Sequence, residues 1–158
     1  MSTRVAHALT SVDELRDKAE LVDIVYYEVS GRRLDGFTSG STVCRDDVTP
    51  DDDTAEIELM QRLEGDTIYI RLRALVITAQ GRLIADVAAV FRTPERVSVS
   101  PPVISQFADI IATPVVRPYL REAIHQTAVR LGIDAPLLSI LDTRERTYWH
   151  MKPGNAAT

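Results

Sequence analysis

Cysteine is almost absent from this chain of 158 residues, which carries only Cys44. A single thiol forms no intrachain disulfide, so the core must hold the fold, and a cytoplasmic location is the simplest expectation. Excess positive charge is also missing. The net charge of −5 disfavours non-specific binding to nucleic acid or to an anionic membrane surface. No apolar run is long enough for a membrane span, and the N-terminal segment does not resemble a secretory signal.

Motifs that support catalysis are scarce too. The chain has no phosphate-binding glycine loop and no nucleophile elbow. The aspartates between positions 46 and 53 lack the alternating ligands and closing glutamate of a calcium loop. Glu122 and His125 have the Glu-x-x-His spacing of di-iron bundles, but such sites need two copies on four helices. We therefore predict no enzyme activity, cofactor or metal. A small ligand-binding protein or enzyme with a pocket around Glu122 and His125 is the alternative.

Strand patterns, by contrast, are plentiful. The segments "TAEIELMQRLEG", "DTIYIRLRALVITA" and "GRLIADVAAVFR" alternate apolar and polar residues and are joined by short turns that contain glycine. This pattern predicts an antiparallel meander of three strands. The β-branched and aromatic residues of "LVDIVYYEVSGRRL" add a fourth strand. Across the strands, Glu56 and Glu58 are expected to pair with Arg71 and Arg73.

Helix signals flank the strands. Ser11 opens a capping box that predicts a short helix over about 12–21, and Ser100-Pro101 opens a longer helix that Gly132 ends. Pro118 inside that helix costs on the order of 3 kcal/mol. We therefore expect a break or sharp kink around 112–117, with a second segment from about 118 to 131.

The expected fold is α+β. A four-stranded antiparallel sheet carries a long proline-interrupted helix packed on one face. The length of 158 residues suits a single domain, and its ends, at about 1–10 and 150–158, are expected to be flexible.

The segment "VVRPYLREAI", residues 115–124, resembles the start of the long helix in the SecB family of protein-export chaperones. "IYIRLRALVITAQG" and "APLLSIL" are similar to the third strand and the proline-led connector of that family, so the resemblance covers about residues 20–141. It implies an ATP-independent holdase that binds unfolded polypeptides or preproteins. It also implies a homotetramer built as a dimer of dimers, without nucleic acid or membrane insertion.

Two sets of residues follow from this resemblance. The candidates for lining a client-binding groove are Phe37, Leu137, Leu138 and Leu141, for which core or subunit packing is an equal alternative. The candidates on an oligomer-forming helix are Val116, Pro118, Tyr119, Leu120 and Ile124.

The chain also departs from the SecB pattern. Members of the family carry acidic residues that contact the SecA motor on the strand corresponding to "LIADVAAVF". Here Val87, Ala88 and Ala89 occupy that place. The second C-terminal helix is missing, and a helix before the first strand is extra. These features resemble the SecB-like chaperones of toxin–antitoxin–chaperone modules, which protect an antitoxin. The sequence thus leaves both SecA and an antitoxin open as partners.

Overall fold

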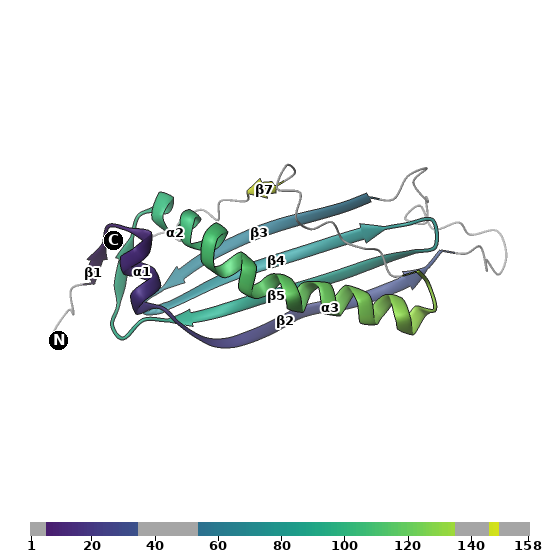
Figure 1. Ribbon diagram of the computed structural model, residues 1–158, viewed down its shortest axis with the longest axis horizontal. Coiled ribbons are helices and arrows are strands. Elements are labelled where there is room, and N and C mark those ends of the chain that lie inside the picture. The colour runs from purple at the N-terminus through teal and green to yellow at the C-terminus, as the bar shows by residue number, and fades with distance from the viewer. Residues whose placement is uncertain (1–5, 35–53, 135–145, 149–158) are drawn as a thin grey trace, which may run out of the picture.

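The computed structural model describes residues 6–34, 54–134 and 146–148. Its main sheet follows the order β2-β5-β4-β3-β7, and the first four strands are antiparallel to their neighbours. The strands of this sheet are β2 (Glu20–Arg33), β3 (Thr54–Glu64), β4 (Thr67–Ile77), β5 (Gly81–Arg92) and β7 (Arg146–Tyr148). A long helix crosses one face of the sheet (Figure 1). The predicted α+β fold with its four antiparallel strands is confirmed.

The face of the sheet below the helix forms the core. The residues predicted to share this face on β4 and β5 are all buried: Ile68, Ile70, Leu72, Ala74, Val76, Leu83, Ala85, Val87, Ala89 and Phe91. Phe91 meets Phe107 of the helix edge to face, with ring centroids 5.0 Å apart. Burial of one apolar face against a helix is the main stabilising term for such a layer.

The long helix has three consecutive parts, α2 (Pro101–Phe107), η1 (Ala108–Ala112) and α3 (Thr113–Leu131). The predicted break around 112–117 is wrong, because α3 runs unbroken through Pro118. The irregularity lies earlier, in the π-helical turn η1, where the Thr113 amide donates to the carbonyl of Ala108. A π turn is wider than an α turn, which gives the ring of Pro114 room against the preceding carbonyls.

Packing on the sheet explains why Pro118 is tolerated. Pro118 lacks the amide hydrogen that would bond to the carbonyl of Pro114, so the helix loses one hydrogen bond there. Val116, Leu120 and Ile124 flank that gap and are at most 1% exposed. Their burial against the sheet holds the two sides of the gap in line.

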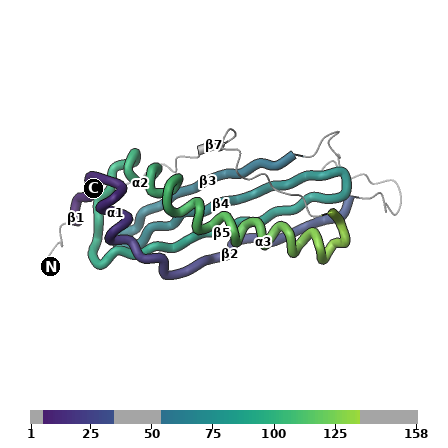
Figure 2. The backbone as a smooth tube through the Cα atoms, viewed as in Figure 1, coloured from purple at the N-terminus to yellow at the C-terminus, as the bar shows by residue number. Residues whose placement is uncertain are grey.

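Glycines allow α3 to lie close to the sheet and to end where predicted. A Cβ on Gly31 of β2 would lie 2.6 Å from Cγ2 of Thr127, so any other residue would force a shift where the helix meets the strand. Gly132 caps α3 with a φ of 63°, in the left-handed region. Figure 2 follows the backbone from α2, near β3, to the end of α3, near β2.

The N-terminal region adds elements outside the main sheet. The capping box at α1 (Val12–Lys18) is confirmed: the Glu14 amide donates to Ser11 Oγ over 3.2 Å, and Glu14 Oε2 accepts from the Thr10 amide over 2.9 Å. These hydrogen bonds to the carboxylate lower the pKa of Glu14. The helix ends at Lys18, short of the expected residue 21, because β2 begins at Glu20.

A strand pair not anticipated from the sequence precedes α1. β1 (His7–Leu9) runs parallel to β6 (Val97–Val99) and places Leu9, which is 3% exposed, in the core. Within the range expected to be flexible, about 1–10, residues His7–Leu9 thus form a strand. Flexibility of the remaining terminal residues stays a prediction.

Candidate binding surfaces and a buried ion pair

Large apolar side chains are exposed mainly on β2, the first strand of the main sheet. Among the residues whose burial the structure describes, the exposed large apolar ones are Leu21, Val22, Tyr26, Tyr27 and Val29 on β2 and Ile110, Tyr119 and Val129 on the helix. The β2–β5 register pairs Leu21 with Phe91, Tyr26 with Val87 and Val29 with Ala85. Paired residues point to the same face of a sheet, so these three side chains extend the core face beyond the helix. We call Leu21, Tyr26, Val29 and Tyr119 the β2 patch.

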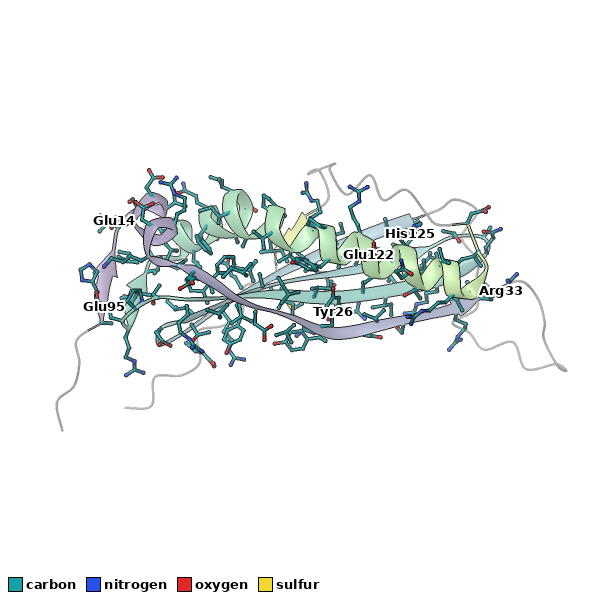
Figure 3. All side chains as sticks on the ribbon, turned by 60° about the horizontal axis from the view of Figure 1, so that its bottom comes forward. Glu14, Tyr26, Arg33, Glu95, Glu122 and His125 are labelled. Carbon is teal, nitrogen blue, oxygen red and sulfur yellow. The ribbon has the colours of Figure 1, made fainter. Side chains whose placement is uncertain are left out.

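Tyr26 links β2 to α3 within this patch. Burial raises the pKa of Tyr26 above its ordinary value, and the neighbouring Tyr119 and Glu122 of α3 raise it further. Figure 3 shows Tyr26 on β2 and Glu122 on α3. Tyr26 is still 48% exposed and Tyr119 40% exposed, so the two rings form an accessible aromatic surface where the helix meets β2.

Two irregularities shape β2. The register with β5 shifts between Leu21 and Asp23 and again between Tyr26 and Glu28. An extra residue in one strand of an antiparallel pair twists and bends that strand. At the second shift, Tyr27 contacts the Arg71 guanidinium, whose central carbon lies 4.1 Å from the ring centroid. Arg71 and its partners lie on the face of the sheet opposite the helix, which we call the outer face.

A buried ion pair occupies the outer face. Nε and Nη2 of Arg71 donate to the two carboxylate oxygens of Asp86, each over 2.6 Å. Arg73 lies 3.7 Å from the same carboxylate and 3.4 Å from Glu28. Asp86 is only 1% exposed. Its hydrogen bonds raise the pKa of Arg71, so the guanidinium stays charged.

These contacts correct the predicted cross-strand pairs. The register places Glu58 opposite Arg73, as expected, but Glu56 lies opposite Leu75 and Met60 lies opposite Arg71. The arginines make their closest ion pairs with Asp86 on β5 and Glu28 on β2. Both of these strands lie on the side of β4 that is away from β3. Asp86 was missed, although a lone acid in the apolar strand "LIADVAAVF" signals a position that faces away from the core.

The edge of β3 facing away from β4 carries a short strand from the C-terminal part of the chain. β7 runs parallel to β3, with Arg146, Thr147 and Tyr148 paired with Ile57, Glu58 and Leu59. Figure 1 shows β7 beside β3. Backbone pairing at this edge was not predicted for residues near the C-terminus.

The predicted site residues divide into three groups. Phe37, Leu137, Leu138 and Leu141 lie outside the described residues. Val116, Leu120 and Ile124 are buried beneath α3 in the core of the chain itself. Pro118 and Tyr119 are exposed, so they are the members of the oligomer-helix set that a second subunit can reach. The oligomer role of the set stays a prediction.

The alternative of a ligand pocket around Glu122 and His125 finds no support in their surroundings. Both side chains are exposed, and Glu122 Oε1 accepts a hydrogen bond from Gln126 on the same helix. Over residues 6–34, 54–134 and 146–148, no three His, Cys, Asp or Glu side chains gather as metal ligands. None of the helices described is long and apolar enough to cross a membrane.

Comparison with known proteins places this arrangement in a class. No family model matches the chain. Among solved structures, it is similar to the SecB-like chaperone Rv1957 of Mycobacterium tuberculosis, solved in complex with a ChAD peptide from the antitoxin HigA1. That likeness has a TM-score of 0.60 at 14% sequence identity and covers 81% of this chain and 91% of the other. The fold is therefore that of a SecB-like chaperone.

A relative found by sequence similarity supports the same conclusion. The chain is 33% identical over 137 residues to the SecB-like chaperone SmegB of Mycolicibacterium smegmatis, which covers 86% of this chain and 84% of the relative. The protein belongs to the SecB-like chaperone family. The family resemblance inferred from the sequence is confirmed.

Proposed function

We propose that this chaperone is an ATP-independent holdase that binds unfolded polypeptides in the cytoplasm and catalyses no reaction. The observation that carries the proposal is the likeness to the SecB-like chaperone SmegB, and it is supported by the β2 patch, a row of large apolar side chains that are exposed in the described part of the chain. Soluble proteins cover such rows unless they use them for assembly or for binding. A holdase needs both, because it must assemble and must also hold non-native apolar segments.

The β2 patch suits assembly of the expected homotetramer. It combines an outer strand with the exposed ring of Tyr119 on α3, so a second copy can bury strand and helix together. Tyr26 and Tyr119 supply large amphipathic surfaces of the kind that interfaces favour. A dimer formed there, paired with another dimer, would give the dimer of dimers.

We assign client binding to residues outside the β2 patch. Phe37, Leu137, Leu138 and Leu141 remain our candidates for the groove, because large apolar side chains can hold unfolded segments without sequence specificity. Polar surroundings keep such a groove from aggregating with itself.

The outer face favours an antitoxin over the SecA motor as the dedicated partner. The acid closest to the positions where SecB proteins present their SecA-binding carboxylates is Asp86, which is 1% exposed and bonded to Arg71. A carboxylate held in this way offers no free charge to a basic partner. The structural relative Rv1957 is bound to an antitoxin peptide, which supports the antitoxin-dedicated variant of the holdase. Preprotein holding for export is the second candidate.

Aggregation of a denatured client tests the proposal. The purified protein at a near-stoichiometric ratio, without ATP, is expected to delay light scattering by chemically denatured client after dilution. Absence of any delay would contradict the holdase. The two variants of the proposal separate in a competition experiment, since a dedicated chaperone binds its antitoxin segment in preference to a denatured preprotein.

A further inference from the structure

The edge of β3 that faces away from β4 is able to accept an extended chain. β7 is added there in parallel through three register pairs, with Ile57, Glu58 and Leu59 as the partners on β3. A strand edge presents every second backbone amide and carbonyl to whatever lies beside it, so pairing requires an extended backbone and no particular sequence. An edge that recognises only the backbone suits a protein that binds many different polypeptides.

Along most of this edge, the described part of the chain places no strand beside β3. β3 runs from Thr54 to Glu64, and β7 pairs with only three of its positions. Within the described residues, no strand lies beside 54–56 or 60–64 on that side. A longer extended segment would therefore form more backbone hydrogen bonds with β3 than β7 does.

The two faces of β3 indicate which segments fit. Ile57, Leu59 and Leu63 share the helix side of the sheet and pack against the core or lie in it. Glu56 and Glu58 lie on the outer face. A strand added at an edge places alternate side chains beside each set, so apolar residues would lie beside the first set and basic residues beside the second.

We propose that the β3 edge is the site where an extended client segment of alternating apolar and basic residues adds to the sheet, with residues 146–148 of the chain as an internal competitor. This inference deepens the proposed holdase function and rests on it. The client is any non-native polypeptide with such an alternating stretch.

The competitor lowers apparent affinity without preventing binding. Because β7 belongs to the same chain as β3, it competes at a high effective concentration. It offers only three pairs, so a longer segment displaces it. The apparent dissociation constant of the client equals the intrinsic one divided by the fraction of molecules with a free edge. Weakening β7 should therefore tighten client binding.

Two prolines test the competitor in the full-length protein. Consecutive residues of a strand direct their amides to opposite sides, so the double variant Thr147→Pro with Tyr148→Pro removes an amide from the β3 side in either register. The matched control places the same two prolines at Ala156 and Ala157. Hydrogen exchange at residues 57–59 is expected to be faster in the test variant than in the parent or the control.

The probe is a synthetic peptide of about ten residues alternating valine and lysine, long enough to cover β3. Its affinity is expected to be about threefold or more higher for the test variant than for the parent and the control. Two further peptides carry N-methyl groups on the valines only or on the lysines only. With the valines toward the helix side and the peptide parallel to β3, as β7 is, one set of amides faces β3, so one methylated peptide should bind and the other should not.

Three results would overturn the inference: equal peptide affinity for parent and test variant, equal exchange at residues 57–59 in both, or equal binding of the two methylated peptides. The aggregation assay with the parent protein keeps the proposals apart. If the parent delays aggregation while any of these results appears, the holdase stands and the β3 edge is not its site. If the parent fails to delay aggregation, the holdase itself fails, whatever the peptides do.

Discussion

Arg71 on β4 bonds diagonally to Asp86 on β5 through two hydrogen bonds of 2.6 Å, yet the two side chains differ sharply in exposure. The Asp86 side chain is 1% exposed and that of Arg71 is 34% exposed. Freed from its partner, the arginine can turn toward water, whereas the aspartate cannot. The two ends of the pair are therefore unequal in their importance for stability.

Removal of Arg71 should cost more than removal of Asp86. Arg71→Ala leaves a buried carboxylate with Arg73 as its nearest cation, and we expect a loss of about 3–5 kcal/mol in the free energy of unfolding. Asp86→Ala leaves a partly exposed guanidinium, and the expected loss is about 1–2 kcal/mol. Urea denaturation measures both. Equal losses would show that Asp86 reaches water more easily than its burial indicates.

Pro118 tests whether the long helix is continuous in solution. If α3 runs through it, Pro118→Ala restores an amide that can bond to the carbonyl of Pro114, and stability should rise by up to about 3 kcal/mol. Pro114→Ala is the control, since Pro114 lies in the first turn of α3, where the change should stay within about 1 kcal/mol. Thermal unfolding followed by circular dichroism compares the two. A loss of stability in Pro118→Ala would support the break that the sequence predicted.

Gly31 should resist any side chain. Its Cβ would lie 2.6 Å from Thr127 Cγ2 and 2.7 Å from Leu131 Cδ1, so these side chains or α3 itself would have to shift. Gly31→Ala is expected to cost about 1–3 kcal/mol through this overpacking. Ser30→Ala, at the adjacent exposed position of the same strand, is the control and should be close to neutral. Denaturant unfolding of both variants decides whether the close approach of helix and strand exists in solution.

The β2 patch should control the association state. Val29→Lys places a charge on the face that a second copy would bury, and it is expected to convert the proposed tetramer to smaller species in sedimentation velocity experiments. Ser30→Lys adds the same charge on the opposite face of β2 and should leave the tetramer intact. If Val29→Lys remains tetrameric, assembly uses another surface.

Tyr26 should ionise at higher pH than an ordinary tyrosine, because burial, Tyr119 and Glu122 raise its pKa. A pKa that is higher in the folded state adds stability below the ordinary tyrosine range, and this stability is lost as the pH rises through the folded value. The absorbance of tyrosinate measures this ionisation, and the part of the signal that disappears in Tyr26→Phe belongs to Tyr26. Glu122→Gln should move the pKa part of the way back, since burial is the larger cause. An unchanged titration in Glu122→Gln would exclude its contribution.

Much of the sheet could be read from the sequence because each strand follows one local rule. The alternation of "IYIRLRALV" fixes which side chains of β4 face the core, and short glycine turns fix the antiparallel order. The start of the long helix at Pro101 and its end before Gly132 follow in the same way from the local preferences of proline for the first turn and of glycine for the C-terminal cap.

What could not be read depends on contacts between distant segments. The unbroken helix at Pro118 is stabilised by packing of Val116 and Leu120 on the sheet, which no local proline rule includes. The pairing of Asp86 with Arg71 required the position of β5 beside β4. Strand addition by β7 joins residues almost ninety positions apart, as Ile57 and Arg146 show, and three residues carry no pattern of their own.

The π turn η1 fixes the rotational phase between the two ends of the long helix. Each residue of an α-helix turns the chain by about 100°, so one residue more or less rotates everything that follows. Val103, Ile104 and Phe107 before η1 and Val116, Leu120 and Ile124 after it all reach the core, although five residues of wider helix lie between them. Deletion of a single codon between 108 and 112 would put one of these apolar stripes out of phase with the sheet. The wide turn therefore determines how well this helix tolerates insertions and deletions. A lineage that loses the wide turn must rebuild one half of the helix's apolar face.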